Sequence, residues 1–457
     1  MKFGGTSVED AAAFRRVAGI VADRLSQRPI VVVSAMSGMT DALLASVEVA
    51  ANGRRKDALA SQFDRHSAVA KELLTPAEVE IFNAELERQR GEIKERLEQL
   101  SQNPQQRPRL QDSIIAAGEQ LSSALFAATL RSMKVAAIVV DARRCIVTND
   151  EYGCAAPLLP ETIRKTQKEL LPLIAGQKVP VLGGFFAATA SGFTTTLGRG
   201  GSDYTASIIG AAISAQEIQI WTDVPGVLTA DPRVVPHAFT IPRLSYAEAA
   251  ELAYFGAKVL HPKTIQPAVE DAIPVRICNS REPAGGGTLV CAEIETAAQT
   301  VKAIAHKKGI TTIQVSSARM LGAYGFLRAI FETFDKHRTV VDVVTTSEVS
   351  VSLSLDDTSE LAPIVAELES LGTVSVETER AMICVVGTGL RGTPGIAARV
   401  FSTISNINVM LISQGSSSIN LTFVIEERQL NEAVTRLHAS FFETESVNQQ
   451  TAVAMVS

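Results

Sequence analysis

Four short apolar runs separated by helical stretches constrain the fold of residues 1–280 more than any other feature. The runs are PIVVVSAM (29–36), VAAIVVDA (135–142), VPVLGGFFA (179–187) and EIQIWTDV (217–224), and most are rich in β-branched residues. Strands that read as continuous apolar runs are buried on both faces, as in parallel sheets covered by helices. The sequence therefore predicts an α/β fold with an open, mainly parallel sheet sandwiched by helices.

Residues 54–110 interrupt this alternation with a charge-rich stretch. It contains IFNAELERQRGEIKERLEQL and ends in QNPQQRPRL. Glu, Arg, Lys and Gln at helical spacing are typical of solvated helices. We expect an exposed helical insertion without a functional role.

The carboxyl-terminal third contains two copies of one pattern. GFLRAIF (325–331) and GIAARVF (395–401) lie 70 residues apart, and so do EVSVSLS (348–354) and SINLTFV (418–424). Each copy is typical of a βαββαβ unit. The second copy lacks a clear last strand, whereas VKAIAHKK (301–308) precedes the first, so we infer that this early strand completes the later unit. The predicted domains are 1–290, a first small domain at 309–380, and a discontinuous second one at 300–308 plus 381–450.

Glycine and hydroxyl residues follow several of the predicted strands. The junctions are KFGGTS (2–7), VVVSAMSGMTD (31–41), VPVLGGFFA (179–187) and TTTLGRGGSDYTA (194–206). One such cluster is usually only a turn, but loops at the carboxyl ends of parallel strands meet in one crevice. Ser7 and Asp10 have the spacing of a capping box, which predicts a helix amino terminus able to bind phosphate.

The cations expected near these loops are Lys2, Arg199 and Lys258. Lys2 and Lys258 lie among apolar and small residues, where a cation needs an anionic partner. Residues 1–280 contain neither G-x-x-x-x-G-K-[ST] nor G-x-G-x-x-G. Both absences argue against a P-loop NTPase, a dinucleotide enzyme and a protein kinase.

Composition excludes several further classes. A net charge of -6 offers no basic surface for nucleic acid. The five cysteines are scattered without close pairs, which indicates neither a disulfide framework nor a cysteine zinc site. The start, MKFGGTSVED, lacks a signal-peptide core, and no run approaches the roughly 18 apolar residues of a membrane span. We expect a soluble, cytoplasmic protein without nucleic-acid or membrane partners.

Four motifs together resemble the aspartate kinases (aspartokinases) of the amino-acid kinase family. They are KFGGTS, TTTLGRGGSDYTA, WTDVPGVLTADPR (221–233) and FGAKVLHP (255–262). The resemblance covers nearly the whole chain, because that family carries a carboxyl-terminal pair of ACT domains, which are βαββαβ units. MLGAYGFL (320–327) and VDVVTTSEVSVSLSLD (341–356) are most similar to the monofunctional, lysine-sensitive type.

The resemblance implies transfer of the γ-phosphoryl group of ATP to the β-carboxylate of L-aspartate, giving 4-phospho-L-aspartate, the first step toward lysine, threonine and methionine. The carboxylate is ionised at neutral pH and is itself the nucleophile, so no general base is required. Mg2+ would enter with ATP through its phosphates, with no metal ligand from the protein. L-Lysine would be the allosteric inhibitor, and the enzyme a homodimer, or a tetramer, joined through ACT domains.

The family motifs also imply roles for individual residues. Those implied in catalysis are Lys2, Gly4, Gly5, Asp203 and Lys258. Those implied in aspartate binding are Ser34, Thr40, Glu119, Arg199, Gly201, Ser202 and Asp203. Those implied in ATP binding are Lys2, Gly5, Ser7, Thr222, Asp223, Leu228, Arg233 and Lys258. Those implied in effector binding are Met320, Ala323, Tyr324, Phe326, Leu327, Asp342, Thr346, Ser347 and Val349, with Asp342 or Glu348 as partner of the effector ammonium.

Two departures from the family pattern accompany these expectations. Leu228 stands where relatives usually have an aromatic residue, and relatives carry a few apolar residues before Lys2, so we expect a frayed first strand. Two other functions also fit: a kinase for glutamate or acetylglutamate, and a catalytically silent amino-acid sensor built on the ACT pair. An ACT pair that only dimerises, without a ligand, is the simplest alternative for the carboxyl-terminal part.

Overall fold

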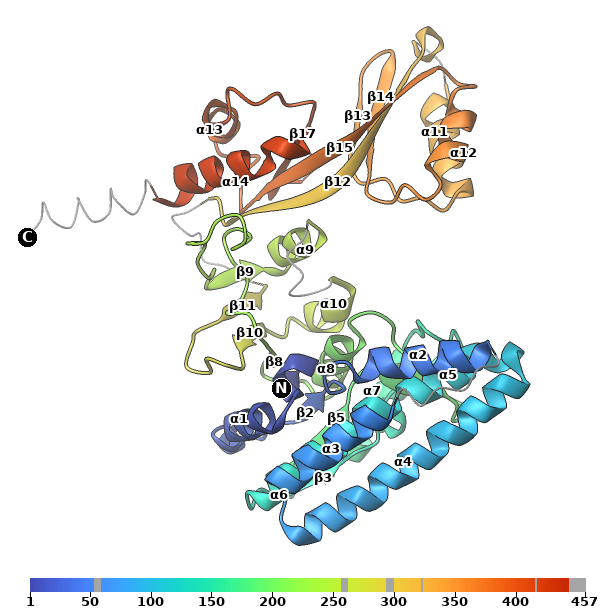
Figure 1. Cartoon of the computed structure of the whole chain (residues 1–457). Helices are drawn as coiled ribbons and strands as arrows, with labels where there is room; N and C mark the ends of the chain where they lie inside the picture. Colours follow the sequence, from blue (N-terminus) through green and yellow to red (C-terminus); the bar gives the residue numbers. More distant parts are fainter. Residues whose placement is uncertain (53–58, 256–261, 293–299, 322–323, 416, 444–457) are drawn as a thin grey trace, which may run out of the picture. The chain divides into compact units, whose positions relative to one another are not determined.

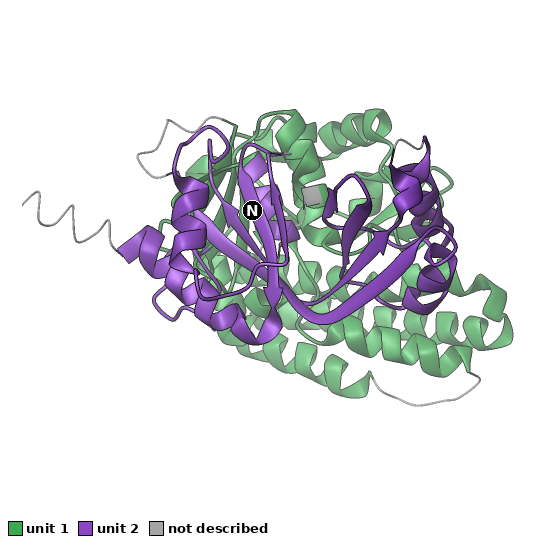
Figure 2. Ribbon diagram, turned by 90° about the horizontal axis from the view of Figure 1, so that it is seen from above, with its two compact units in different colours: residues 1–227, 242–246, 259–294 green, residues 228–241, 247–258, 295–457 purple. Residues whose placement is uncertain are grey.

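The computed structural model describes the chain apart from residues 53–58, 256–261, 293–299, 322–323, 416 and 444–457 (Figure 1). The chain forms two compact units (Figure 2). The first comprises residues 1–227, 242–246 and 259–294, and the second comprises residues 228–241, 247–258 and 295–457.

The first unit is built on an eight-stranded sheet with the order β3-β5-β2-β1-β8-β10-β11-β9. Its strands are β1 (Lys2–Phe3), β2 (Val31–Val33), β3 (Ala137–Val139), β5 (Val179–Gly183), β8 (Ile218–Thr222), β9 (Arg243–Ser245), β10 (Val275–Asn279) and β11 (Thr288–Cys291). Neighbouring strands pair in parallel except β10 and β11, which are antiparallel. The prediction of an open, mainly parallel sheet is confirmed, and each of the four apolar runs contains one of its strands.

A small second sheet has the order β4-β6-β7. Its strands are β4 (Val147–Thr148), β6 (Phe186–Thr189) and β7 (Thr194–Thr196). The helices of this unit are α1 (Ala11–Ala22), α2 (Met39–Ala51), α3 (Ala60–Leu73), α4 (Pro76–Gln102), α5 (Arg107–Ile115), α6 (Ala117–Ser132), α7 (Leu159–Ala175), α8 (Gly201–Ala212) and α10 (Pro262–Glu270). The main core contains Phe3, Phe14, Phe126 and Trp221 at the contact of α1 and α6 with the sheet.

The charge-rich stretch is helical, as predicted, but it is not an exposed insertion. Phe63 of α3 and Phe82, Ile93 and Leu100 of α4 are buried in the main core. On the outer side of α4, Arg88 forms ion pairs with glutamates one helical turn away in each direction. Charged residues dominate the composition of α4, but a narrow apolar stripe along one face is enough to pack the helix against the core while its opposite face is solvated.

Two further expectations about the amino terminus are wrong. β1 is short but not frayed, because it pairs with β2 on one side and β8 on the other, and Phe3 is fully buried. The capping box of Ser7 and Asp10 is not formed. Asp10 itself caps α1 by accepting a hydrogen bond from Ala13 N, whereas Ser7 lies in the preceding 3-10 helix, Gly5–Val8.

By length and composition, the helical stretch Pro104–Ser132 could cross a membrane. Within it, 83% of the most apolar 18-residue segment is buried inside the protein. The buried residues of α6, which ends this stretch, include Leu121, Leu125 and Phe126 of the main core. The stretch therefore has the burial of a core helix.

The second unit contains a six-stranded sheet with the order β13-β14-β12-β15-β17-β16. The strands are β12 (Ala303–Ser316), β13 (Val344–Thr346), β14 (Ser350–Leu355), β15 (Thr373–Val386), β16 (Leu411–Gln414) and β17 (Asn420–Glu426), and all neighbours are antiparallel. Its helices are α9 (Tyr246–Tyr254, whose first residue belongs to the first unit), α11 (Phe326–Lys336), α12 (Leu361–Leu368), α13 (Ile396–Thr403) and α14 (Leu430–His438).

The two long central strands, β12 and β15, contribute residues to two separate hydrophobic cores, one at each end (Figure 1). The far half of β12, with Ile313, packs with α11 and α12, whereas its first half, with Ile304, packs with α13 and α14. Ala303–Lys307 pairs with Met382–Val386 of β15, which in turn pairs with β17. The residues of VKAIAHKK thus form part of the sheet that carries the second repeat.

GTGLRG (387–392) follows β15 and has the G-x-G-x-x-G spacing. β15 pairs antiparallel with both neighbours, so this is not the parallel βαβ unit that a dinucleotide-binding fingerprint requires.

Candidate active site

A cavity of about 590 Å³ lies in the first unit, where loops at the ends of its strands meet. It is lined by residues after β1, after β2 and between β7 and α8, together with residues of α5 and α6. Nine predicted residues line it: Lys2, Gly5, Ser34, Thr40, Glu119, Arg199, Gly201, Ser202 and Asp203. Gly4 is adjacent, since a Cβ there would lie 3.7 Å from the Lys2 ammonium.

Lys2 and Asp203 form an ion pair in this cavity. The Lys2 Nζ lies 2.7 Å from Asp203 Oδ1, and the two side chains are only 11% and 18% exposed. Lys2 extends from β1, and Asp203 lies in the first turn of α8. A cation and an anion that share a poorly solvated site each offset the desolvation of the other, so the pair holds the ammonium in one place.

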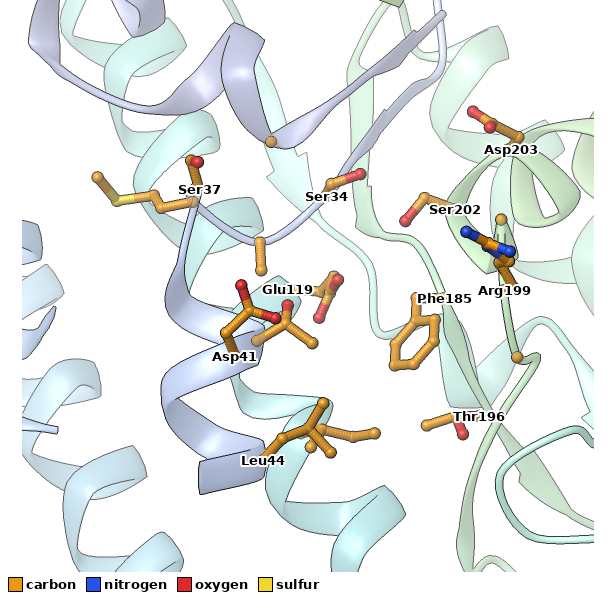
Figure 3. A pocket seen from close by; sticks show the side chains of 18 of the residues that line it. Ser34, Ser37, Asp41, Leu44, Glu119, Phe185, Thr196, Arg199, Ser202 and Asp203 are labelled. Atoms are coloured by element: carbon orange, nitrogen blue, oxygen red, sulfur yellow. The ribbon is translucent and has the colours of Figure 1, made fainter. Parts of the chain in front are cut away.

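Glu119 is a buried carboxyl group in the same cavity. In the view of Figure 3 its side chain lies with Asp41 on one side, Phe185 on the other and Ser34 above it. Burial raises the pKa of Glu119 to about 8, although hydrogen bonds from two backbone N–H groups and the charge of Lys2 act in the opposite direction. Among the described residues, Oε2 has no hydrogen-bond partner. A buried acceptor left unpaired is costly, and it is suited to a donor that arrives with a ligand.

Close backbone approaches shape the wall of the cavity around α8. Gly200 precedes the helix with φ 72°, a left-handed conformation that glycine adopts without strain. A Cβ on Gly184 would lie 2.7 Å from Ser202 Cβ, and a Cβ on Gly201 would lie 2.8 Å from Phe185. The glycines therefore let the amino terminus of α8 face the cavity, and a helix amino terminus favours anions.

Sequence reasoning missed two residues of this region. Phe185 lines the cavity with φ 71°, a conformation that bulky residues rarely adopt. Asp112 of α5 is fully buried and accepts hydrogen bonds from Gly153 N, Thr196 N and Thr196 Oγ1 at 2.8 to 3.0 Å. The available signals were the glycine pair before Phe185 and an Asp shortly before the apolar run IIAAG (114–118), and neither is specific.

The residues predicted to bind ATP lie in several parts of the chain. Thr222 ends β8, and its hydroxyl lies 3.1 Å from a carboxylate oxygen of the exposed Asp223. Ser7 is fully buried and bonds through its hydroxyl to Ser280 at 2.8 Å. Leu228 and Arg233 belong to the second unit, and Arg233 pairs with Asp231 at 2.6 Å. Lys258 lies outside the described residues.

The predicted effector residues belong to the half of the second unit formed around α11. Met320, Phe326, Leu327, Thr346, Ser347 and Val349 lie just before α11, at its first turn, or around β13, and Tyr324 is fully exposed. Ala323 lies outside the described residues.

Asp342 stands out among these residues. Its side chain is only 2% exposed, and its Oδ1 accepts a hydrogen bond from the Tyr254 hydroxyl of α9. Its Oδ2 has no hydrogen-bond partner within the described part of the chain, and the Lys307 ammonium lies 4.0 Å away. Lys307 is engaged by Asp356 in an ion pair, so the Asp342 carboxylate retains an open acceptor.

Comparison with known proteins identifies the family. The model of the amino acid kinase family matches residues 1–279, and a model of the ACT domain matches residues 383–441. Lysine-sensitive aspartokinase 3 of Escherichia coli is 38% identical over 450 residues, covering 97% of this chain and 98% of that protein. The chloroplastic aspartokinase 2 of Arabidopsis thaliana is 36% identical, covering 97% and 84%.

Solved structures agree. Escherichia coli aspartokinase III in complex with aspartate and ADP (R-state) matches with a TM-score of 0.80 and 36% identity, over 96% of this chain and 99% of that one. The same enzyme in complex with lysine and aspartate (T-state) matches with a TM-score of 0.81 and 37% identity, over 96% and 98%. The chain described here belongs to the aspartokinases, within the amino acid kinase family.

Proposed function

We propose that the cavity of the first unit binds L-aspartate and ATP and transfers the γ-phosphoryl group to the aspartate β-carboxylate. The observation that carries this proposal is a buried acceptor, Glu119 Oε2, which has no partner in the described part of the chain and shares one cavity with Lys2, Asp203 and the amino terminus of α8. A substrate with one ammonium and two carboxylates complements such a set of groups.

The contacts to aspartate follow from charge. Glu119 receives the α-ammonium, because a charged donor satisfies its open oxygen and restores the ionised carboxylate. Arg199, exposed at the rim of the cavity, receives the α-carboxylate in a bidentate contact. Ser34, Thr40 and Ser202 supply neutral hydrogen bonds that fix the orientation. Asp203 has a further role, since it positions Lys2.

The chemical step needs orientation and charge neutralisation. A β-carboxylate oxygen attacks the γ-phosphorus while the bond to the bridging oxygen breaks and ADP leaves, and no proton moves. Lys2 and Lys258 neutralise the oxygens of the transferred group. Backbone N–H groups near Gly4, Gly5 and Gly201 contact the phosphates, since glycine permits close approach.

We propose that Thr222, Asp223, Leu228, Arg233 and Lys258, with Gly5 and Ser7, contact the nucleotide. Mg2+ accompanies ATP and is held through phosphate oxygens. Two carboxyl groups of the cavity support this assignment, because Asp203 Oδ1 is paired with Lys2, and the raised pKa of Glu119 favours its neutral form, which is a poor ligand for Mg2+. The ion, when bound, neutralises phosphate charge.

We propose L-lysine as the inhibitor, bound around β13 and the start of α11. The open Oδ2 of Asp342 is the acceptor for an effector ammonium. The hydrogen bond from Tyr254 joins this carboxylate to α9, only four residues before Lys258. An effector that competes for Asp342 would thus act on the residues that precede the phosphoryl clamp, giving two states with different catalytic geometry.

For the whole protein we propose the domains 1–290, 309–380 and 300–308 plus 381–450, a cytoplasmic location, and a homodimer or tetramer joined through the ACT domains. The half around α11 exposes apolar side chains typical of an interface, namely Leu321 (65%), Tyr324 (105%), Val340 (67%) and Val349 (44%).

The deciding experiment is ADP release from Mg-ATP with L-aspartate, L-glutamate or N-acetylglutamate, each with and without L-lysine or L-threonine. We expect release with aspartate alone, suppressed by lysine. Release only with another acceptor would replace aspartate as the substrate. No release with any acceptor, together with retained lysine binding, would favour the silent sensor.

A further inference from the structure

A second cluster of polar side chains lies in the second unit, away from the residues proposed for effector binding. His237 comes from the segment 228–241, His438 ends α14, and Glu443 ends the following turn, Ala439–Glu443. His237 Nε2 lies 2.5 Å and His438 Nδ1 lies 3.3 Å from the same oxygen, Glu443 Oε1. We infer that these three side chains form a binding site for a divalent transition-metal ion of the zinc type.

The geometry suits such an ion after small movements. The three candidate ligand atoms lie within 4.8 Å of one another. Zinc binds imidazole nitrogen and carboxylate oxygen at about 2.0 to 2.2 Å, so ligand atoms around a tetrahedral ion are roughly 3.3 Å apart. His438 is buried and held in place, with a side chain only 1% exposed, whereas His237 and Glu443 are 57% and 49% exposed and can adjust around the ion.

The buried histidine also has the outer contact that metal ligands need. His438 Nε2 lies 2.9 Å from Thr229 Oγ1, and that oxygen accepts a hydrogen bond from Phe239 N at 3.2 Å. Histidine ligands usually make such a bond through their second nitrogen, which fixes the ring orientation. The Phe442 ring, 4.8 Å from the His438 ring between centroids, and Phe239 add an apolar shell.

The donor set selects the class of ion. Two imidazoles and one carboxylate favour zinc, nickel or cobalt, whereas Mg2+ prefers oxygen ligands alone. The site therefore differs chemically from any site for the Mg2+ that accompanies ATP, and the inference stands without the proposed function.

The consequence of ion binding would be a cross-link between distant parts of the chain. His237 and Glu443 are separated by 206 positions. The segment that carries His237 already contacts the second-repeat core through Ala230 and Val235, and Thr229 O accepts a hydrogen bond from Ile304 N at 2.8 Å. An ion bound only by the folded protein would stabilise this arrangement by mass action.

The test is zinc binding to the full chain, treated with EDTA and desalted, in competition with a chromogenic chelator. We expect the wild type to bind one more equivalent of Zn2+ than His237→Gln or Glu443→Gln. Thr229→Val should weaken that equivalent about tenfold to a hundredfold. The matched control is His337→Gln, because His337 also lies beside a glutamate, Glu367, at 3.1 Å, and it should bind as the wild type does.

Thermal unfolding supplies a second readout. Zinc, but not Mg2+, should raise the midpoint of the wild type and of His337→Gln and leave that of His237→Gln unchanged. Because the replaced side chains at 237 and 443 are half exposed, their metal-free midpoints should match the wild type. Equal zinc stoichiometry and affinity in wild type and His237→Gln, or no zinc binding by the wild type, would overturn the inference.

Discussion

Replacing Glu119 by Gln should stabilise the ligand-free protein while weakening aspartate binding. Burial raises the pKa of the Glu119 carboxyl from 4.5 to about 8. The folded protein therefore loses stability as pH rises from 4.5 to 8, because the unfolded chain releases this proton and the folded chain retains it. Glutamine keeps the shape of the side chain without ionising.

The magnitude follows from the same shift. One pKa unit corresponds to about 1.4 kcal/mol, so the gain in unfolding free energy is bounded by about 3 kcal/mol at pH 7 and about 5 kcal/mol at pH 8, and it vanishes below pH 4.5. Losing a charged hydrogen bond to the substrate ammonium costs about 1.5 to 3 kcal/mol. The KM for aspartate should therefore rise about tenfold to a hundredfold at pH 8.

Denaturant unfolding in one-unit steps from pH 5 to pH 8, alongside initial rates with aspartate, measures both effects. Glu80→Gln, which changes an exposed glutamate on α4, is the matched control and should alter neither. A stability difference that does not grow with pH would refute the burial argument. An unchanged KM would move the ammonium site away from Glu119.

Four other substitutions test the remaining assignments. Lys258→Ala should lower turnover at least about tenfold with lysine binding intact by calorimetry, and unchanged turnover would remove it from the phosphoryl clamp. Asp342→Ala should relieve lysine inhibition in a dose-response assay without changing the aspartate KM, whereas persistent inhibition would place the effector elsewhere. Asp112→Ala leaves two buried donors of Thr196, its N–H and its hydroxyl, without their acceptor and should cost about 2 to 4 kcal/mol in denaturant unfolding, and a loss under about 1 kcal/mol would contradict a structural role for Asp112. Gly184→Ala puts a Cβ 2.7 Å from the Ser202 Cβ in the first turn of α8, so kcat/KM should fall about tenfold or more. Wild-type kinetics would show that α8 can move away from residue 184 without loss of activity.

The sequence alone determined the main sheet of the first unit and several of the residues that line its cavity. Apolar β-branched runs between helices specify a buried parallel sheet, and parallel strands bring the loops at their carboxyl ends to one edge. For that reason Lys2 and Ser34, although far apart in the chain, could be expected in one cavity, which both line. Arg199 also lines it, but its loop follows β7 of the small sheet, where β6 and β7 are antiparallel, so the rule for parallel strands does not account for its place. The family resemblance added their roles, which spacing alone does not specify.

Only the tertiary structure decided which polar groups are buried, paired or left open. Phe82 and Ile93 lie in a helix whose composition indicated a solvated element, and burial depends on what packs against a stripe rather than on the stripe alone. The open oxygen of Glu119 and the approach of His237 to Glu443 are likewise long-range facts. Local patterns specify strands and helices because those depend on neighbouring residues, whereas burial and pairing depend on contacts between segments that only the folded chain brings together.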